Sequence, residues 1–250
     1  MKTIDEVFRK PGVALGTWVT MNDPVVVELA KAAGFDFVRL DNEYNPYDTS
    51  MVAQMIATAN NIGIPIIVRI SRLEDITMFV SCGADGIMIP DGTYERALET
   101  VERAKYAPLG KRSVASSSRA VRISGLGFKE YHKQANKHVS VVVQIEDPRG
   151  MADIDKILSL EGVDLVGSGR ADIAQALGVP GEPGHPKVDE FEDTIIKKAL
   201  EYKKLPILMV NANRAAQEKL LKKGVNVMVV SQDFEFMFNG MQAIVQEMKQ

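Results

Sequence analysis

The chain of 250 residues has few of the side chains from which many functional sites are built. It contains one cysteine, three histidines and one tryptophan. The single Cys82 excludes a disulfide within the chain and is typical of a reducing compartment. No cysteines or histidines are spaced as zinc ligands, and neither a nucleophile elbow nor a Walker-type phosphate loop occurs. A zinc domain, a serine hydrolase of that type and a P-loop enzyme are therefore excluded.

Excess positive charge and long hydrophobic runs are also absent. The formal net charge is −3, whereas a nucleic-acid partner calls for a basic surface. No apolar run reaches the roughly 18–20 residues of a membrane span. The segment MKTIDEVFRKPG is charged throughout and lacks the apolar core of a signal peptide. We therefore expect a cytoplasmic protein with no nucleic-acid or membrane partner.

Eight short, apolar, β-rich stretches recur along the chain. They lie at residues 14–19, 37–40, 65–70, 86–90, 139–145, 164–167, 206–210 and 226–230. Runs such as IIVRI, SVVVQI and VMVV are continuously apolar, as parallel strands covered on both faces should be.

Helical patterns alternate with these stretches. The first runs from Asp23-Pro24 to Gly34, and the second from Thr49 or Ser50 to Gly63. The others lie at residues 92–105, 150–159, 190–202, 214–223 and 234–249. Strict alternation of eight strands with helices predicts one (β/α)8 barrel domain spanning residues 1–250. A doubly wound open sheet is the alternative, but it more often has five or six strands. Residues 106–127 and 179–187 are predicted to be irregular, the first as a long polar loop and the second as a proline-rich turn.

Two carboxylates stand just past predicted strands. Glu146 closes VSVVVQIE, and Asp172 lies in VDLVGSGRAD. The carboxyl ends of parallel strands meet at one rim of a barrel, where such folds place their chemistry. Paired carboxylates with little histidine or cysteine nearby suit Mg²⁺ or Mn²⁺, because these cations prefer oxygen ligands.

Arg69 and the turn GSGR add positive character to that rim. Arg69 interrupts the apolar run IIVRIS, and a buried charge is costly unless it is paired. It either forms an ion pair with Asp41 or Glu43 or neutralises a substrate oxyanion. The turn GSGRAD precedes a helical pattern beginning near Ala171, and free N–H groups at a helix start bind anions. The histidines at 132, 138 and 185 lie away from predicted strand ends.

In order and spacing, seven segments resemble the metal-dependent (class II) pyruvate aldolases. These segments are LGTW, GFDFVRLDNEYNPYD, PIIVRI, GADGIMIP, VVVQIED, VDLVGSGRADIAQALG and PGEPGHPKV. The family includes 4-hydroxy-2-oxoheptanedioate aldolase and 2-keto-3-deoxy sugar-acid aldolases. The resemblance implies a barrel of the phosphoenolpyruvate/pyruvate type, and a homo-oligomer, a trimer or hexamer, whose last helix is exchanged between subunits.

The same resemblance implies roles for individual residues. Glu146 and Asp172 would hold the divalent cation, Mg²⁺ or Mn²⁺, with Co²⁺ also compatible. Gln144 and the backbone amides of Ala171 and Asp172 would hold the carboxylate of a 2-oxo acid. In addition, Arg69 would stabilise the enolate oxygen and Trp18 would line the pocket. The expected activity is that of a carbon–carbon lyase acting on a 2-oxo acid and an aldehyde.

Several positions depart from the family pattern. Tyr44 stands where the family has its basic histidine, and Ser81 stands where it has the aspartate that supports this histidine. Arg170 would add a cation at the mouth, and Asp91 takes a position that is expected to be apolar. A phenol with an ordinary pKa near 10 is a poor base at neutral pH. We therefore predict intact metal and carboxylate sites with weak or altered aldol turnover, because decarboxylation of a β-keto acid such as oxaloacetate needs no base.

Other functions remain open on the sequence alone. One is a 2-oxo-acid-binding paralogue with impaired aldolase activity. Another is a phosphate-handling barrel enzyme, such as an isomerase, that uses GSGR for a phosphate. The last helical pattern carries surplus apolar residues that fit either a subunit contact or packing on the chain's own barrel, namely Phe234, Phe236, Met237, Phe238, Met241, Ile244, Val245 and Met248.

Overall fold

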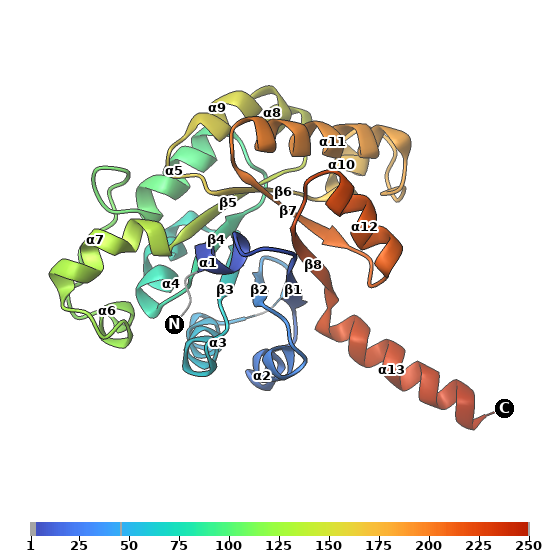
Figure 1. Ribbon diagram of the computed structural model, residues 1–250, viewed down its shortest axis with the longest axis horizontal. Coiled ribbons are helices and arrows are strands. Elements are labelled where there is room, and N and C mark those ends of the chain that lie inside the picture. Colours follow the sequence, from blue (N-terminus) through green and yellow to red (C-terminus); the bar gives the residue numbers. More distant parts are fainter. Residues whose placement is uncertain (1–3, 46, 250) are drawn as a thin grey trace.

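The computed structural model describes residues 4–45 and 47–249, and its strands close into a parallel barrel in chain order (Figure 1). The first and last strands, β1 and β8, pair with each other, so the sheet has no edge. The strands are β1 (Ala14–Val19), β2 (Phe37–Asn42), β3 (Ile66–Ile70), β4 (Gly86–Ile89), β5 (Ser140–Ile145), β6 (Leu165–Ser168), β7 (Leu205–Val210) and β8 (Val227–Gln232). The predicted (β/α)8 barrel is confirmed and the doubly wound alternative is wrong.

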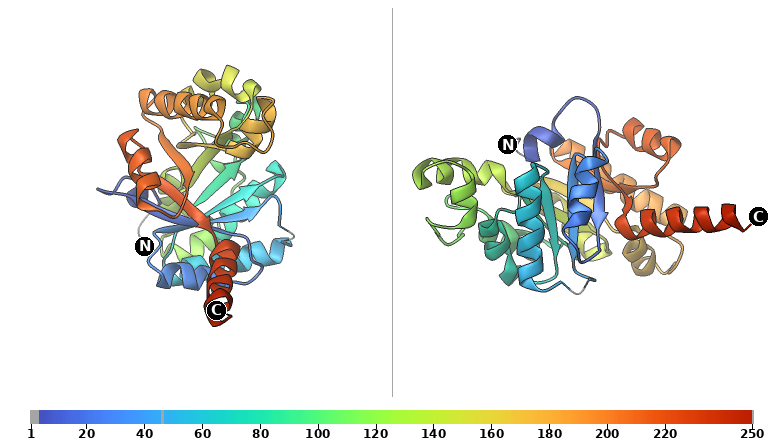
Figure 2. Two further views of the ribbon diagram at one scale, coloured as in Figure 1. Left: turned by 90° about the vertical axis from the view of Figure 1, so that its right-hand side faces the viewer. Right: turned by 90° about the horizontal axis from the view of Figure 1, so that it is seen from below.

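Helices surround the barrel on its outside (Figures 1 and 2). They are α1 (Ile4–Phe8), α2 (Val25–Ala32), α3 (Thr49–Ile62), α4 (Ile76–Cys82), α5 (Tyr94–Ala104), α6 (Arg119–Ile123), α7 (Phe128–His138), α8 (Pro148–Ala152), α9 (Ile154–Ser159), α10 (Arg170–Ala176), α11 (Pro186–Glu201), α12 (Arg214–Lys222) and α13 (Asp233–Met248), with a short 3-10 turn at Leu73–Asp75.

Three helical predictions need correction. The stretch 106–127 is not wholly irregular, because α6 forms within it and buries Ala120 and Val121 beside Tyr106. The helix predicted at 150–159 is two helices that break at Asp153. The helix predicted from residue 190 begins at Pro186, since proline suits the first helical position.

Side chains that point inward fill the barrel below its mouth. Phe37, Ile67, Met88 and Val142 belong to one buried cluster with α1, which closes the amino end. The ring of Phe8 in α1 meets that of Phe37 edge-on, with centroids 4.9 Å apart. The interior is therefore closed at the bottom, and access is left to the carboxyl end.

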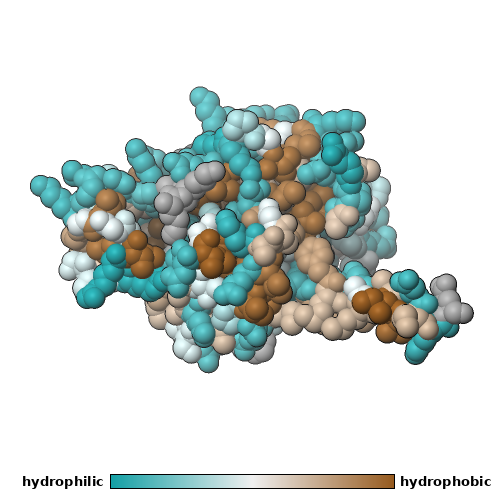
Figure 3. All heavy atoms as spheres, turned by 60° about the horizontal axis from the view of Figure 1, so that its bottom comes forward, coloured by the Kyte–Doolittle hydropathy of each residue, from teal (hydrophilic) through white to brown (hydrophobic). Residues whose placement is uncertain are grey.

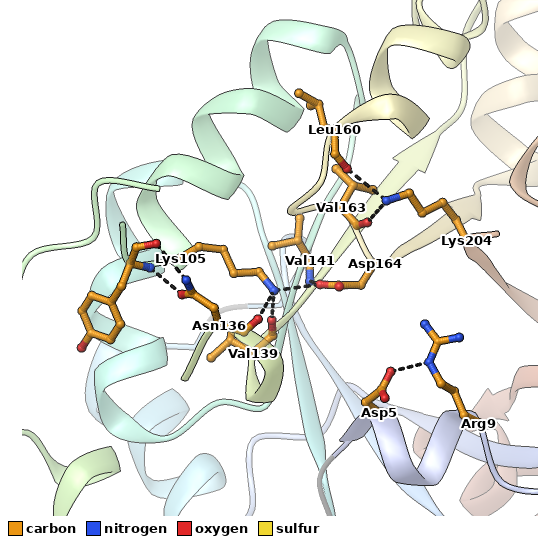
Figure 4. Close-up of polar contacts among 11 residues, drawn as sticks. Asp5, Arg9, Lys105, Asn136, Val139, Val141, Leu160, Val163, Asp164 and Lys204 are labelled. Carbon is orange, nitrogen blue, oxygen red and sulfur yellow. Dashed lines mark hydrogen bonds and ion pairs between the residues drawn. The ribbon is translucent and has the colours of Figure 1, made fainter. Parts of the chain in front are cut away.

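Acidic residues join neighbouring strands at the amino end. Asp36, Asp85 and Asp164 directly precede β2, β4 and β6, and each accepts a hydrogen bond from a backbone N–H at the start of the preceding strand. Figure 4 shows one of these sites, where Asp164 accepts from Val141 N at 2.8 Å and from Lys105 Nζ at 3.0 Å. These bonds fix the strand register far from the mouth.

The C-terminal helix α13 projects away from the barrel (Figures 1 and 2). Its first residue, Asp233, is buried and accepts hydrogen bonds from the backbone N–H groups of Thr20 and Met21, which fixes where the helix begins. All eight apolar side chains predicted for this segment are exposed, and Figure 3 shows apolar side chains along the helix. Phe236, near the start of α13, still contacts Phe35 of the same chain, but most of the helix does not pack on its own barrel. Among the described residues, no helix is long and apolar enough to span a membrane.

Candidate active site

Arg69 is the central cation of the barrel mouth. It is the second-to-last residue of β3 and is buried. Its Nε lies 2.8 Å from Asp41 Oδ1, and its Nη1 lies 3.1 Å from Glu43 Oε2. Both predicted ion-pair partners are thus present. The remaining nitrogen, Nη2, makes no hydrogen bond to the protein. The carboxylates hold the guanidinium in place and leave one donor for a ligand.

Two aromatic rings flank this guanidinium. Arg69 Cζ lies 4.6 Å from the ring centre of Trp18 and 5.0 Å from that of Tyr44. Tyr44 itself is 68% exposed. Loss of solvent around its hydroxyl, followed by the charges of Glu43 and Asp172, raises the pKa of Tyr44 to about 12. Arg69 opposes this shift without reversing it, so the phenol stays protonated and cannot act as a base near neutral pH.

Gln144, near the end of β5, and Glu146, just past it, lie on the side of the mouth opposite Arg69. Both are buried, and Gln144 Nε2 donates to Glu146 Oε2 at 2.5 Å. The other carboxylate oxygen, Oε1, accepts the backbone N–H of Asp91 at 2.9 Å. Burial raises the pKa of Glu146 to about 7 against these hydrogen bonds, and the charges of Asp172 and Asp91 add to the rise. The site has a surplus of negative charge on this side.

Gly169 shows how closely these groups converge. A methyl group built on its Cα would lie 2.0 Å from Glu146 Oε2, 2.7 Å from Gln144 Nε2 and 3.1 Å from Asp172 Oδ2. The sequence-predicted ligands Glu146 and Asp172 therefore border one small space together with Gln144. Only glycine leaves that space open.

The donor set at this space fits a hard divalent cation. It offers two carboxylates, and burial, with a smaller contribution from the charges of Asp172 and Asp91, raises the pKa of Glu146. Within 4–45 and 47–249, no group of three or more acidic, histidine or cysteine side chains could hold a metal ion. Mg²⁺ commonly binds through one or two carboxylates and takes its other ligands from water and substrate. A closed, all-protein metal cage is thus absent from the described residues, while an open two-carboxylate site is compatible with them.

The start of α10 lies beside this space. The sequence suggested that Arg170 adds a cation at the mouth, and this expectation needs correction. The amides of Arg170, Ala171 and Asp172 lie in the first helical turn, where backbone N–H groups have no partner within the helix. The Arg170 side chain instead contacts Glu192 Oε2 at 2.6 Å and Asp189 Oδ1 at 2.5 Å. Its charge is neutralised by α11, so it is not a free cation at the mouth.

Ser81 and the histidines lie outside the site. Ser81 lies near the end of α4, at the amino end of the barrel, whereas Tyr44 follows the carboxyl end of β2. The two positions therefore cannot form a dyad within one chain. His185 caps α11, and His132 stacks on Tyr106 with ring centres 4.5 Å apart. These histidines have structural contacts, as expected.

Two further residues belong to the mouth and its floor. Asp91 has a φ of 50°, which is unusual for a residue other than glycine and places its N–H against Glu146. Arg39, in the middle of β2, is 3% exposed and its Cζ lies 3.9 Å from the Trp18 ring centre. Our sequence analysis missed Arg39, although a charge inside the run FVRL on the same side as Asp41 was a usable signal.

Comparisons with known proteins agree with this geometry. A family model described as HpcH/HpaI aldolase/citrate lyase matches residues 14–239. The chain is 31% identical over 241 residues to a 5-keto-4-deoxy-D-glucarate aldolase of Escherichia fergusonii, covering 95% of this chain and 93% of that protein. It is 32% identical over 247 residues to a hydroxypyruvate/pyruvate aldolase of Pseudomonas aeruginosa, covering 97% and 91%.

A solved structure is also similar over the whole length. The HpcH/HpaI aldolase from Desulfitobacterium hafniense superposes with a TM-score of 0.93 at 26% identity, covering 100% of this chain and 98% of that one. The similarity in sequence and the similarity in structure point to the same family of carbon–carbon lyases. The chain belongs to the HpcH/HpaI aldolase/citrate lyase family.

Proposed function

We propose that the protein is a divalent-metal-dependent lyase that acts on a 2-oxo acid through a pyruvate enolate. The observation that carries this proposal is the convergence of Gln144, Glu146 and Asp172 around Gly169. The fixed guanidinium of Arg69 and the aromatic ring of Trp18 line the other side of the mouth. Glu146 and Asp172 on one side and Arg69 on the other suit a reaction in which negative charge develops on a substrate oxygen between them.

Glu146 and Asp172 would hold Mg²⁺ or Mn²⁺, and Co²⁺ would also be compatible with these ligands. When bound, such a cation acts as a Lewis acid toward a keto oxygen. The substrate carboxylate would be bound by the side-chain amide of Gln144 and by the backbone N–H groups of Ala171 and Asp172. Gln144 borders the space at Gly169, and α10 begins at the next residue, so binding by these donors would orient the 2-oxo acid before any bond breaks.

Arg69 would stabilise the developing enolate oxygen through its unpartnered Nη2. In decarboxylation of an oxaloacetate-type acid, the bond to the leaving carboxylate breaks and its electron pair forms the enolate. No protein base is needed for that step. Aldol cleavage instead requires removal of a proton from the 4-hydroxyl group. Tyr44, with a pKa of about 12, can donate a proton to the enolate but cannot accept this one.

The proposal is tested by comparing two reactions with Mg²⁺ or Mn²⁺. We expect decarboxylation of oxaloacetate above the metal-catalysed background, and slower retro-aldol cleavage of a 4-hydroxy-2-oxo acid. A chelator should abolish both. Brisk, metal-dependent retro-aldol turnover that is undiminished in Tyr44→Phe would show that another residue is the base.

A second candidate is a 2-oxo-acid-binding paralogue with impaired aldolase activity. It is favoured by the replacement of both members of the family dyad, at Tyr44 and Ser81. Binding of pyruvate in the presence of Mg²⁺, without turnover of any 2-oxo acid, would support it.

We also infer that the chain is one barrel domain whose α13 packs on another copy, in a trimer or hexamer. Support comes from the exposed apolar side chains of α13 and from an apolar cavity of about 460 Å³ at its base. The cavity is lined by residues including Val26, Leu29 and Phe236.

A further inference from the structure

Arg39 is a buried cation without an anionic partner. Phe37, Arg39 and Asp41 alternate on the same side of β2, and Phe37 belongs to the barrel interior, so Arg39 also points inward. It lies one two-residue step, roughly 6–7 Å, below the Asp41–Arg69 pair. No carboxylate in the described part of the chain forms an ion pair with it. The floor of the mouth therefore carries a buried cation with no ion-pair partner of its own.

The contacts of Arg39 do not offset that charge. Its Nη1 and Nη2 each lie 3.5 Å from a methionine sulfur, of Met88 and Met209, and thioethers are weak acceptors. Its Nε makes no hydrogen bond to the protein. Burial, and then the like charge of Arg69, lowers the pKa of Arg39 to about 9, while Asp41, Glu146 and Glu43 oppose the shift. The side chain is still charged at neutral pH, in an environment that disfavours the charge.

Three buried donors on adjacent strands have no hydrogen-bond partner among the described residues. They are Trp18 Nε1, Arg39 Nε and Arg69 Nη2, on β1, β2 and β3. The ring of Trp18 contacts both guanidinium groups, at 3.9 Å from Arg39 and 4.6 Å from Arg69. The carboxylate Glu146 follows β5 directly, and Asp172 lies in the first turn of α10, after β6. Both arginines of the mouth thus lie on β2 and β3, where Asp41 and Glu43 pair with Arg69, and Glu146 and Asp172 lie on the other side.

We propose that the charge of Arg39 stabilises the doubly charged enolate more than it stabilises the singly charged 2-oxo acid. This inference rests on the proposed function. A 2-oxo monocarboxylic acid carries one negative charge, whereas its enolate carries two. A second buried guanidinium beneath Arg69 interacts more strongly with the second state. Only such differential interaction lowers a barrier. In the ligand-free protein, the same charge is destabilising.

The test uses two anions with Mg²⁺ and the fluorescence of Trp18, the single tryptophan, which contacts Arg39. Oxalate is a planar dianion that resembles the enolate, and pyruvate is the monoanion. Arg39→Met removes the charge at similar length, and Arg39→Lys keeps it. We expect Arg39→Met to weaken oxalate binding by about tenfold to fiftyfold and pyruvate binding by less than about threefold. Arg39→Lys should stay near wild type.

A thermal melt of the ligand-free proteins supplies a second measurement. We expect Arg39→Met to melt at a higher temperature than wild type, because an apolar side chain replaces an unpaired buried charge. A lower melting temperature together with unchanged binding of both anions would assign Arg39 to packing alone. If Arg39→Met weakened the binding of oxalate and of pyruvate by the same factor, the proposed preference for the enolate would be overturned. If the wild type bound neither anion, both the proposed function and this inference would fail. If the wild type bound both anions and Arg39→Met bound them with the same affinities, only this inference would be overturned.

Discussion

The side chain of Gln144, near the end of β5, donates to Oε2 of Glu146, two residues further along the chain, at 2.5 Å. Residues two apart along an extended chain point to the same side, so the end of β5 places the Gln144 amide and the Glu146 carboxylate side by side. The N–H of Asp91 holds the other carboxylate oxygen. These two hydrogen bonds thus fix the orientation of the Glu146 carboxylate.

Glu146→Gln should abolish metal binding without unfolding the protein. The amide keeps the size of the side chain and an oxygen for the Asp91 N–H, but it removes the charge that holds the cation. We expect Mn²⁺ affinity to fall by at least about 100-fold, as measured by calorimetry. The metal-free variant should melt no lower than wild type, since burial raises the pKa of Glu146 to about 7 and so disfavours its charge. Unchanged Mn²⁺ affinity would place the cation elsewhere.

Gly169→Ala should damage the site through one methyl group. The backbone at Gly169, with φ −116° and ψ 93°, is accessible to alanine, so strain in the main chain is not the cause. The added carbon would instead lie 2.0 Å from Glu146 Oε2. We expect Mn²⁺ affinity to fall by at least about tenfold. Gly184→Ala, where nothing lies within 4 Å, is the matched control and should bind Mn²⁺ normally.

The barrel and the position of Glu146 and Asp172 at its mouth could be predicted because they follow from local sequence. Buried parallel strands read as continuous apolar runs, and each strand end identifies residues of the mouth. The role of Arg170 could not be predicted, because its partner Glu192 lies 22 residues further along the chain, on another helix. The direction of α13 was equally hidden. An apolar stripe shows that a helix buries one face, but not which molecule covers it.

Tyr44→His should increase aldol turnover selectively. Imidazole has an ordinary pKa near 6.5 and can accept the 4-hydroxyl proton that a phenol cannot. We expect retro-aldol cleavage to rise by about tenfold or more, with oxaloacetate decarboxylation changed by less than about threefold. Both rates can be followed by coupling pyruvate release to NADH oxidation. Tyr44→Phe is the control and should give no increase, and an equal increase in both reactions would contradict a role limited to the base.

Charges placed on α13 should dissociate the oligomer. Met241 and Ile244 are 59% and 63% exposed in the single chain, and burying such side chains against another copy would stabilise the assembly by about 1.5–3 kcal/mol each. We expect the double variant Met241→Glu/Ile244→Glu to sediment as a monomer while wild type sediments as a trimer or hexamer. Gln242→Glu adds a charge on the same helix without removing an apolar side chain, and it should leave the assembly intact. A wild-type monomer would refute the proposed contact.

Asp85 should make stability fall as pH rises. Asp36 and Asp164, at the equivalent positions of β2 and β6, form ion pairs with Lys10 and Lys105, but no ion pair joins Asp85 to a basic side chain in the described residues. Burial raises the pKa of Asp85 to about 7, although the N–H of Ile66 opposes the shift. The folded state therefore holds its proton more tightly than the unfolded state does.

The contribution of Asp85 to stability is full below its ordinary pKa near 4 and is lost as pH rises through about 7. Asp85→Asn cannot ionise, yet its side-chain oxygen can still accept the N–H of Ile66. We expect the free energy of unfolding of the variant, relative to wild type, to increase by about 1–3 kcal/mol between pH 5 and pH 8. Urea unfolding at several pH values measures this difference. A constant difference across that range would mean that the Asp85 carboxyl group is already ionised in the folded protein at pH 5, as it would be if water or a cation reached it there.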